Sequence, residues 1–484
     1  MTPSAPSRSL LHLRRDERGV AAVTVAIALP LLLAFGALAI NSGLWFTIKR
    51  ENQSAADAAA ISAAYELMAG PANACTNPGF VTDRLTPAAT QAVAANQHVG
   101  WDSSGTTTTV ICPYPDSLLD TEFGARNYSA VAVTLQQDQS SLFAFAPLAS
   151  ATIATKSVGV VANGASVCIL ALGAAASRSG PCPAGFGICI NGSANSINAP
   201  GCAVVADSTA SNAIDLVGGG GGNLINAAAI QTPGGTAGSG ANNTAPPVQT
   251  FSIPVTDPYA STLTHTALTS GFAGFPDCLR PPPGGTTYGG DCKVPAGWLG
   301  QPSIVLKANT QIDGTWTVLG TVDLKPGTYW VTDGDLNVSG TLECTGCTGG
   351  AGVTIILTTA GTCPATVGTV NFAPGNNSTS LNAPTSGTFK GDLIVQDVNG
   401  VPGCTTYTST PTNLIGTVST SFTGLVYLPH AEMNIFGNPN LGKAGCLVLI
   451  VNDLRMSGNP SLDTNGCAAA GVTPPTVKTV VLGE

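Results

Sequence analysis

The decapeptide EMNIFGNPNL at residues 432–441 recurs in altered form as DLRMSGNPSL at residues 453–462, at an offset of 21 residues. A second pair lies upstream, where WTVLGTV at residues 316–322 matches LNVSGTL at residues 336–342 at an offset of 20. Short alternating strands separated by Gly-Asn or Gly-Thr turns, repeated at this period, are typical of the coils of a β-solenoid. The repeat therefore predicts a mainly β domain, a parallel β-helix or solenoid.

Equivalent residues of the repeat should form rows inside such a stack. A strand of about five residues is too short to bury its apolar side alone, so neighbouring coils must share one core. The predicted rows are Val318 with Val338, Val322 with Leu342, Ile435 with Met456, and Leu441 with Leu462. A β-sandwich in which the segments match by chance is the alternative.

The cysteines indicate an oxidising compartment. There are 14 of them, and none occurs before Cys75. An even number confined to the part of the chain beyond its N-terminal region is typical of an exported domain. Cys446 and Cys467 fall at equivalent points of the repeat, so they could lie on adjacent coils and pair. The sequence leaves the connectivity open among the candidate disulfide cysteines Cys75, Cys112, Cys168, Cys202, Cys182, Cys189, Cys278, Cys292, Cys363, Cys404, Cys446 and Cys467.

Composition limits the class of protein further. Charged residues are 9% of the 484, against roughly 25% in an ordinary soluble domain, and there are 58 glycines and 34 prolines. A turn-rich, weakly charged chain of this length suits an extracellular β-rich protein with two or three folded units. The net charge is −9, and no run of Lys or Arg lies outside the N-terminus, which argues against a nucleic-acid partner.

Residues 19–48, GVAAVTVAIALPLLLAFGALAINSGLWFTI, contain no charge. About 20 apolar residues are enough to cross a lipid bilayer as a helix. Four arginines precede the stretch, against Lys49 and Arg50 after it, which predicts a single pass with the N-terminus in the cytoplasm and the C-terminal domain outside. The helical pattern continues through an alanine-rich segment to residue 69, and Pro71 should end it. This continuation suits either a simple stalk or a pilin-like rod.

A cleavable signal peptide is the alternative to a retained anchor. Ala37-Leu38-Ala39 is an A-x-A sequence that signal peptidase could use. The apolar run nevertheless continues to Trp45 and Phe46, which beside Lys49 and Arg50 resemble an interfacial aromatic belt. A signal peptide does not need that second boundary, so the pattern favours the anchor.

A family resemblance covers residues 14–68. The segments DERGVAAVTVAIALPLLLAFGALAINSGLWF (16–46) and QSAADAAAISAA (53–64) resemble the N-terminal part of TadG-like Flp pilus-assembly proteins. The resemblance implies a structural protein of the bacterial inner membrane, with a role in pilus assembly or surface adhesion and other pilus-assembly or envelope proteins as partners. Thr24 stands where a processed prepilin would carry Glu, five residues after Gly19, which argues against prepilin-type cleavage.

The resemblance extends to shorter segments. AVAVTL (130–135), LFAF (142–145) and ATIAT (151–155) are similar to the membrane-proximal part of TadE/TadG-like proteins. Periodicity predicts a small α+β unit here, with a helix over 86–98 and strands over 106–112, 130–135 and 151–161. A disulfide between Cys75 and Cys112 could cross-link this unit. LKPGTYWV (324–331) and TGLVYLP (423–429) resemble the exported right-handed β-helix region often joined to TadG-like anchors.

These patterns predict five segments along the chain. Residues 163–247 are rich in Gly and Asn and could be irregular coils or a linker; four cysteines favour ordered coils. The predicted division is a basic tail over 1–18, a transmembrane helix over 19–48, a stalk helix with an α+β unit over 49–162, the Gly/Asn-rich segment, and a β-solenoid over 248–484.

No pattern indicates an enzyme or a cofactor. The sequence lacks G-x-S-x-G, G-x-x-x-x-G-K-[ST] and H-E-x-x-H, and its four histidines, His12, His98, His265 and His430, are scattered. The Cys344-x-x-Cys347 motif has no second copy, so a disulfide or packing role is expected rather than zinc. Asp392 and Asp397 are five residues apart, which places them on opposite faces of a strand and makes a shared acid/base pair poor.

Two metal patterns are incomplete. Asp333, Asp335 and Asn337 begin like a calcium loop, but the required Gly and Glu are missing from their places. Residues 102–106, DSSGT, fit the letters of a metal-dependent adhesion site without the buried strand that should precede it. We therefore predict no catalytic, cofactor or metal site.

A surface protein that binds or cleaves polysaccharide is the second hypothesis for function. Many β-helices cleave polysaccharide with paired carboxylates, along a groove lined with aromatic side chains. The local aromatic cluster that could hold a surface glycan consists of Trp298, Trp316, Tyr329 and Trp330.

Overall fold

The computed structural model divides into two compact units, which are described separately. One comprises residues 1–164 and 478–484, and the other residues 165–477. The structure describes residues 17–71, 73–96, 105–115, 118–120, 128–143, 150–176, 182–192, 195–217, 224–240, 242–250, 252–271, 274–359, 367–373, 379–398, 411–416, 420–441, 446–464, 467 and 471–483.

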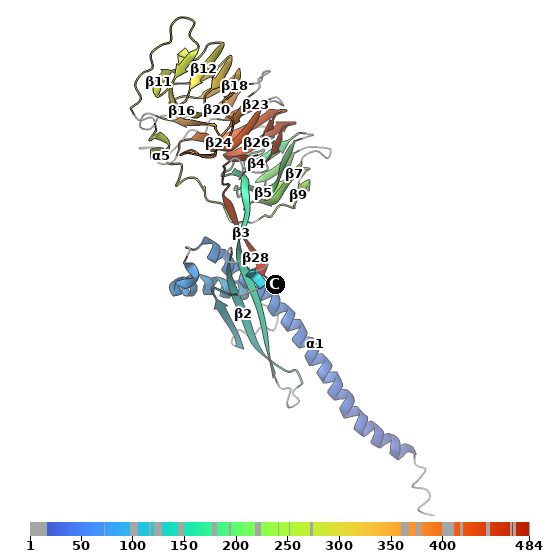
Figure 1. Ribbon diagram of the computed structural model, residues 1–484. Helices are drawn as coiled ribbons and strands as arrows, with labels where there is room; N and C mark the ends of the chain where they lie inside the picture. The colour runs from blue at the N-terminus through green and yellow to red at the C-terminus, as the bar shows by residue number, and fades with distance from the viewer. Residues whose placement is uncertain are drawn as a thin grey trace, which may run out of the picture. The chain divides into compact units, whose positions relative to one another are not determined.

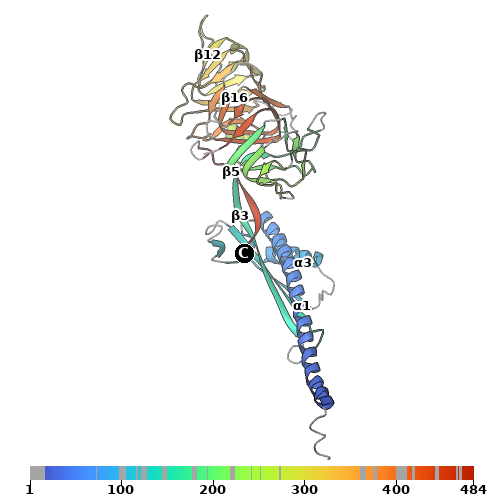
Figure 2. The ribbon, with the colours of Figure 1, turned by 90° about the vertical axis from the view of Figure 1, so that its right-hand side faces the viewer.

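The first unit contains the long helix α1 (Glu17–Ala69), 53 residues with Pro30 inside it (Figure 1). Its alanine-rich second half has high helix propensity, and the helix ends before Pro71, as predicted. Short turns follow as η1 (Ala74–Thr76), α2 (Pro78–Phe80) and η2 (Val81–Leu85), and they lead into α3 (Thr86–Ala95). Figure 2 shows α3 beside α1.

Three antiparallel strands complete this unit. They are β1 (Thr106–Ile111), β2 (Tyr128–Ser140) and β3 (Ser150–Ala171), with β2 in the middle. The last strand of the chain is β28 (Thr476–Gly483). The α+β composition agrees with the prediction, and β2 and β3 are longer than the segments predicted for them.

Small side chains join α1 to the sheet. Six alanines on one side of the helix are completely buried: Ala55, Ala56, Ala59, Ala60, Ala63 and Ala64. They form one core with Val131, Val133 and Leu135 of β2. Alanines at this spacing let the helix backbone approach the strands closely, because no longer side chain holds the two apart.

Parallel strands make up the second unit. They and its helices are β4 (Ile188–Asn191), β5 (Ser196–Ala206), β6 (Ile214–Val217), β7 (Leu224–Gln231), β8 (Thr236–Ala237), β9 (Thr244–Ala245), α5 (His265–Thr269), β10 (Thr287–Gly289), β11 (Cys292–Pro295), η4 (Ala296–Trp298), β12 (Ser303–Lys307), β13 (Thr310–Asp313), β14 (Trp316–Val318), β15 (Thr321–Leu324), β16 (Gly327–Thr332), β17 (Leu336–Val338), β18 (Thr341–Glu343), β19 (Val353–Thr358), β20 (Val370–Phe372), β21 (Ser380–Asn382), β22 (Asp392–Gln396), β23 (Thr412–Gly416), β24 (Ser421–Gly437), β25 (Asn440–Leu441), β26 (Leu447–Gly458) and β27 (Ser461–Asp463).

The two copies of each repeat pair side by side at the predicted offsets. Val318 lies opposite Val338 and Val322 opposite Leu342. The later repeat pairs Ile435 with Met456 and Leu441 with Leu462. The described strand pairs of residues 165–477 are parallel, whereas a β-sandwich would pair its strands antiparallel.

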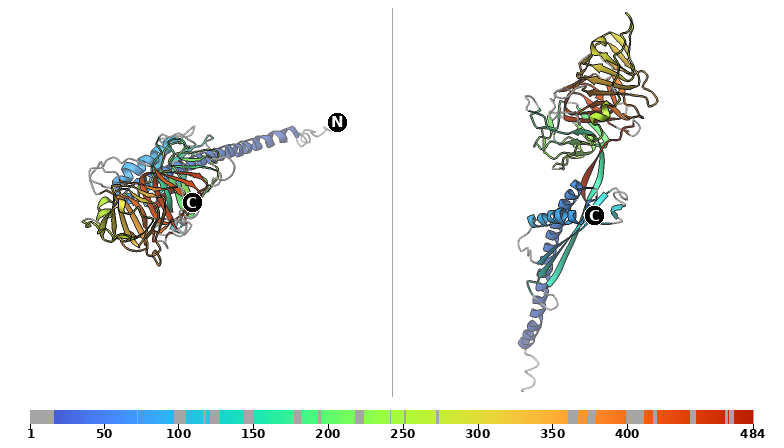
Figure 3. Two further views of the ribbon diagram at one scale, coloured as in Figure 1. Left: turned by 90° about the horizontal axis from the view of Figure 1, so that it is seen from above. Right: turned by 90° about the vertical axis from the view of Figure 1, so that its left-hand side faces the viewer.

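The order of the strands in space differs from their order in the chain. Strand β26 pairs with β24 on one side and with β3 and β4 on the other, and β27 pairs with β5. In Figure 3 the colours accordingly run from yellow through orange and red to green. The described strands between residues 165 and 247 therefore pair with the C-terminal strands and share their core. One compact unit extends across residue 247, where we had predicted a boundary.

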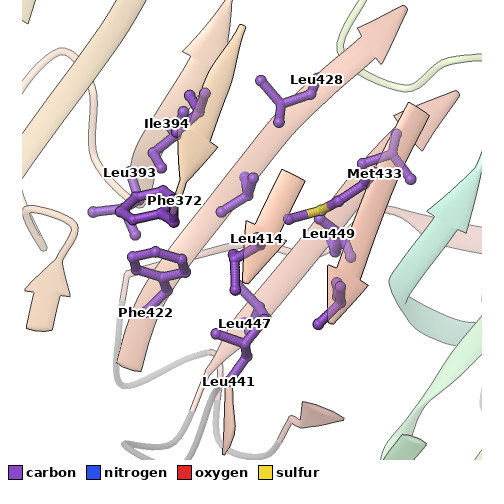
Figure 4. Close-up of a cluster of buried hydrophobic side chains, with 14 of the residues drawn as sticks. Phe372, Leu393, Ile394, Leu414, Phe422, Leu428, Met433, Leu441, Leu447 and Leu449 are labelled. Atoms are coloured by element: carbon purple, nitrogen blue, oxygen red, sulfur yellow. The ribbon is translucent and has the colours of Figure 1, made fainter. Parts of the chain in front are cut away.

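Apolar side chains fill the space between the strands. Phe372 and Phe422 face each other with ring centroids 5.3 Å apart, and both are buried. Leu414, Leu441 and Leu447 from three further strands lie close to them (Figure 4). One continuous core extends from Cys168 to Leu462. Stacking is what creates it, because no single strand of this length encloses an apolar interior.

A second apolar layer lies on the outer side of these strands. Strand residues alternate, so Ile355 faces the core while Ile356 faces outward, and Val395, Tyr427 and Ile450 continue the outward row. Residues 252–271 and 274–278, which we call the covering segment, contribute side chains that pack on this row, including Leu268 and Phe275. An apolar outer face would otherwise contact water.

Asparagines form a ladder along one edge of the stack. Asn371 donates to Asn337 at 3.2 Å, Asn413 donates to Asn371 at 3.4 Å, and Asn434 donates to Asn413 at 3.1 Å. A shorter ladder joins Asn226 to Asn198 and Asn198 to Asp463. Each amide donates to the next, so burial leaves few polar atoms of these rows unpaired; Asn434 Oδ1 is one that has no partner.

Six disulfides lie within the described residues. They are Cys75–Cys112, Cys168–Cys202, Cys182–Cys189, Cys278–Cys292, Cys344–Cys347 and Cys446–Cys467. Cys363 and Cys404 lie outside the described residues. Cys446 and Cys467 are separated by 21 residues, one repeat, and their bond joins two repeats whose strands pair side by side.

Replacing Cys446 and Cys467 together with serine should lower the free energy of unfolding by about 3 kcal/mol, from the loop-closure entropy of about 20 residues. Denaturant unfolding of the full chain, with and without reductant, measures the change. Mass mapping without reduction should recover the Cys446–Cys467 peptide pair from the parent protein. A peptide joining either cysteine to a different partner would contradict the stacking register.

Candidate functional site

The N-terminal part of α1 is apolar and exposed. Residues 22–69 form the one helix of the described chain that is long and apolar enough to cross a membrane, with a mean hydropathy of 2.5 in its most apolar window. Side chains exposed by half or more include Val23, Val25, Ile27, Leu29, Leu31, Leu32, Leu33 and Phe35. Such a surface in water is costly, and it indicates membrane anchoring.

The second half of α1 lies against β2 and β3. Gly159 of β3 faces the helix at the point of closest approach, where a Cβ atom would collide with the carbonyl oxygen of Ala60 and lie 2.8 Å from Ala64 Cβ. Only glycine leaves room for this contact. The position therefore sets how closely the helix can pack on the sheet.

Two buried asparagines on the helix pair with the hairpin of β2 and β3. Asn52 Nδ2 donates to Gln137 Oε1 at 3.0 Å, with both residues fully buried. Asn41 Nδ2 donates to the carbonyl oxygen of Phe143 at 3.0 Å, and Asn41 Oδ1 accepts from the backbone N–H of Leu142 at 3.1 Å. These bonds hold the helix in one register along the strands, because a shifted helix would lose them and add to the buried amide atoms that already lack a partner, Asn52 Oδ1 and Gln137 Nε2.

This helix is the part of the chain that a known family describes. Residues 19–66 match the family model "Putative Flp pilus-assembly TadE/G-like". The match covers the exposed apolar half of α1 and most of its packed half, the same stretch on which the resemblance rested. It supports a role related to the Flp pilus. No similar chain was found among curated proteins or among solved structures.

Polar groups also gather on the outer face of the second unit. Asp397, directly after β22, is buried and accepts hydrogen bonds from Thr358 Oγ1 and His265 Nδ1, both at 2.6 Å. His265 opens α5 of the covering segment. Burial raises the pKa of Asp397, and the bonds from Thr358 and His265 oppose the rise. The hydrogen bond between His265 and Asp397 joins the covering segment to the end of β22.

A second polar group lies near the covering segment. Asp257 Oδ2 accepts from Tyr427 OH at 2.6 Å. Burial raises the pKa of Asp392 to about 6. The pKa of Tyr259 rises to about 12, chiefly through burial and further through the charges of Asp392 and Asp257. Burial lowers the pKa of His430, against the charge of Asp257. Of these carboxyls, Asp257 is hydrogen-bonded to an aromatic hydroxyl group, that of Tyr427.

Asp392 and Asp397, whose spacing argued against a shared acid/base pair, make different contacts. Asp397 is bonded to Thr358 and His265, while the charge of Asp392 raises the pKa of Tyr259. His265 was expected to be isolated, and sequence reasoning missed its contact with Asp397, since the two are 132 positions apart.

The aromatic cluster suggested for the alternative of glycan binding is largely inside the protein, which counts against that alternative. Trp316 and Tyr329 are completely buried in the core, because strand alternation turns them inward. Trp330 faces outward but is 3% exposed, since the covering segment lies over it. Trp298 is partly buried, with Arg280 5.7 Å from its ring centroid.

The residues of the two incomplete metal patterns make other contacts where the structure describes them. Asp333 accepts from Thr359 Oγ1 at 2.5 Å, Asp335 accepts from the backbone N–H of Thr369 at 2.8 Å, and Asn337 belongs to the asparagine ladder. Among the described residues, no group of three or more His, Cys, Asp or Glu could hold a metal ion. His12, His98 and Asp102 lie outside the described residues.

The buried carboxyls predict a pH dependence of stability. Burial raises the pKa of Asp392 and of Asp207 to about 6 from an ordinary value of 3.8. The folded state therefore holds these protons more tightly than the unfolded chain. The free energy of unfolding should fall as pH rises from about 4 to about 6 and level off above, by up to roughly 3 kcal/mol for Asp392 and by less for the more exposed Asp207, whose charge water screens.

Replacing Asp392 with asparagine should flatten this dependence and stabilise the protein at neutral pH. Denaturant unfolding at several pH values measures the slope, and the exposed Asp277→Asn variant is the control that should keep the parent slope. An Asp392→Asn variant whose stability still falls with pH as steeply as the parent's would contradict the assignment.

Proposed function

We propose that the chain is a membrane-anchored, extracytoplasmic structural component of Flp pilus assembly or of surface adhesion. The observation that carries the proposal is the division of α1 at the family-matching segment. Its first half exposes apolar side chains, while its second half packs its alanines on a folded unit. A helix of this kind joins a bilayer to an exported domain.

Orientation and compartment are part of the proposal. The N-terminus lies in the cytoplasm of a bacterial cell, residues 19–48 cross the inner membrane, and the remainder is outside. The excess of arginine before the span supports this direction. The six disulfides support an oxidising compartment for residues 75–467.

We further propose that residues 165–477 form a parallel β-solenoid. Strand pairs offset by about one repeat, asparagine ladders along the stack and a disulfide between adjacent repeats support this architecture. A long stack of this kind suits a spacer or adhesive part, which contacts other pilus or envelope proteins. The buried position of the aromatic cluster favours a structural role over polysaccharide cleavage.

Fractionation with a C-terminal tag tests the anchor. The tagged chain should remain in the membrane pellet after alkaline extraction, and external protease should remove the tag from spheroplasts. Recovery of a shorter, soluble chain beginning after Ala39 would instead show a cleaved signal peptide.

Deletion of the gene tests the pilus role. Loss of the chain should reduce Flp pili on the cell surface, and the full chain should restore them while a chain lacking residues 20–40 should not. Normal pili and normal surface attachment in the deletion strain would contradict the proposal.

A further inference from the structure

Leu142 and Phe143, which follow β2, lie beside the apolar half of α1. Their backbone is held by the side chain of Asn41, which is 2% exposed. Two N–H groups and one carbonyl of the hairpin end are satisfied in this way. Figures 2 and 3 show the hairpin running along α1 in views that differ by 180°.

Several apolar side chains near Asn41, on the helix and on the residues that it holds, are exposed. Leu142 is 66% exposed and Phe143 46%, and on the helix Ile40 is 51% and Phe46 75% exposed. The bonds to Asn41 place the hairpin residues at the height of residue 41, and Phe46 lies about 7 Å further along the helix axis. These side chains are therefore neighbours of the candidate span.

The length of the apolar stretch places this level at a bilayer surface. A helix of 30 residues is about 45 Å long, whereas the hydrocarbon core of a bilayer is about 30 Å thick. If residues 20–40 occupy the hydrocarbon, residues 41–48 lie in the interface. Trp45 and Phe46 are of the type enriched there, and Lys49 and Arg50 follow.

We propose that Leu142 and Phe143 insert into the lipid interface beside α1, as a second membrane contact of the first unit. The chemistry fits a lipid surface in two ways. Transfer of leucine and phenylalanine side chains out of water lowers the free energy. A loop entering a bilayer must also have its backbone hydrogen-bonded within the protein, which is what Asn41 does. The inference rests on the proposed anchor.

Two contacts would have a mechanical consequence. A single helix can rotate about its axis and tilt in a bilayer, and anchors at the interface restrict both motions. The hairpin end would hold the first unit at a defined rotation relative to the membrane plane. A component of an assembly that projects from the membrane needs such a fixed direction.

Spin labelling of the full chain in lipid nanodiscs tests the proposal. Leu142→Cys is labelled without reductant, so that the disulfide-bonded cysteines stay blocked, and the parent chain serves as the unlabelled control. Collision with oxygen, which enters lipid, is compared with collision with a water-soluble nickel chelate. Gln136→Cys, exposed on β2 about 20 Å away along the strand, is the matched water-facing control. Leu32→Cys reports the span itself.

The label at position 142 should favour oxygen over nickel several-fold more than the label at 136. Replacing Asn41 with alanine in the same background should shift it toward nickel. A nickel-accessible label at 142, with Leu32→Cys in lipid, would overturn the interface contact and leave the anchor intact. A label at 142 shielded from both reagents would show a protein partner and also overturn it. A nickel-accessible label at 32 would overturn the anchor and the inference together.

Discussion

Replacing Gly159 with valine should separate α1 from the sheet and lower the free energy of unfolding by at least about 3 kcal/mol, which is the upper end of the usual range for an overpacked core. The added Cβ would meet the carbonyl oxygen of Ala60 and the Cβ of Ala64, two atoms of a helix that cannot move without unpacking its alanine face. A backbone oxygen and an alanine Cβ have no alternative rotamer that would relieve the collision. The expected result is a lower unfolding midpoint of the full chain in detergent, with faster proteolysis between α1 and β1.

Gly43→Ala is the matched control, because a Cβ there meets nothing within 4 Å. It lies in the same helix and should leave the midpoint unchanged or raise it slightly, since alanine favours a helix over glycine. Equal midpoints for Gly159→Val and the parent would show that the helix and sheet do not pack as closely as the structure has them.

Replacing Trp330 with alanine should cost about 3 to 5 kcal/mol, the usual range for a large buried aromatic side chain. Its Nε1 donates to the carbonyl oxygen of Leu268 at 2.8 Å, and its ring lies edge-on to Phe275 with centroids 5.8 Å apart. The ring also fills the space beside Gly271, where a Cβ would lie 2.7 Å from it. The loss should release the covering segment, which would become sensitive to limited proteolysis.

Two variants separate this effect from general loss of an apolar side chain. Leu279→Ala removes a side chain that is 95% exposed just after the covering segment, and it should change neither stability nor proteolysis. Trp330→Phe keeps most of the apolar contact and removes the N–H, so an intermediate loss is expected. A covering segment that stays protected in Trp330→Ala would mean that other contacts hold it.

Local features explain which parts of the fold could be predicted. The charge-free stretch over 19–48 and the alanines that follow indicate one long helix because the helical pattern and propensity are contained in consecutive residues. The offsets of 20 and 21 predicted the pairs Val318 with Val338 and Ile435 with Met456 because two copies of one strand that stack in register show the same residues.

The candidate site was predicted less completely, for a physical reason. Asn41 could be seen as a polar residue in an apolar helix, but its partners Leu142 and Phe143 are about 100 positions away. His265 and Asp397 come together only when the covering segment lies on the strands. A hydrogen bond between residues far apart in the chain produces no repeating pattern in the sequence around either residue, so the sequence alone does not reveal it.

The sequence by itself determined the long apolar helix, the oxidised character of the chain, and the in-register repeats, since each depends on composition or on neighbouring residues. Tertiary structure alone decided which strands stack, with β26 between β24 and the much earlier β3 and β4. It also decided that Trp330 is covered while Leu319 is 63% exposed. Alternation along a strand defines two faces, but only the rest of the fold determines what covers each of them.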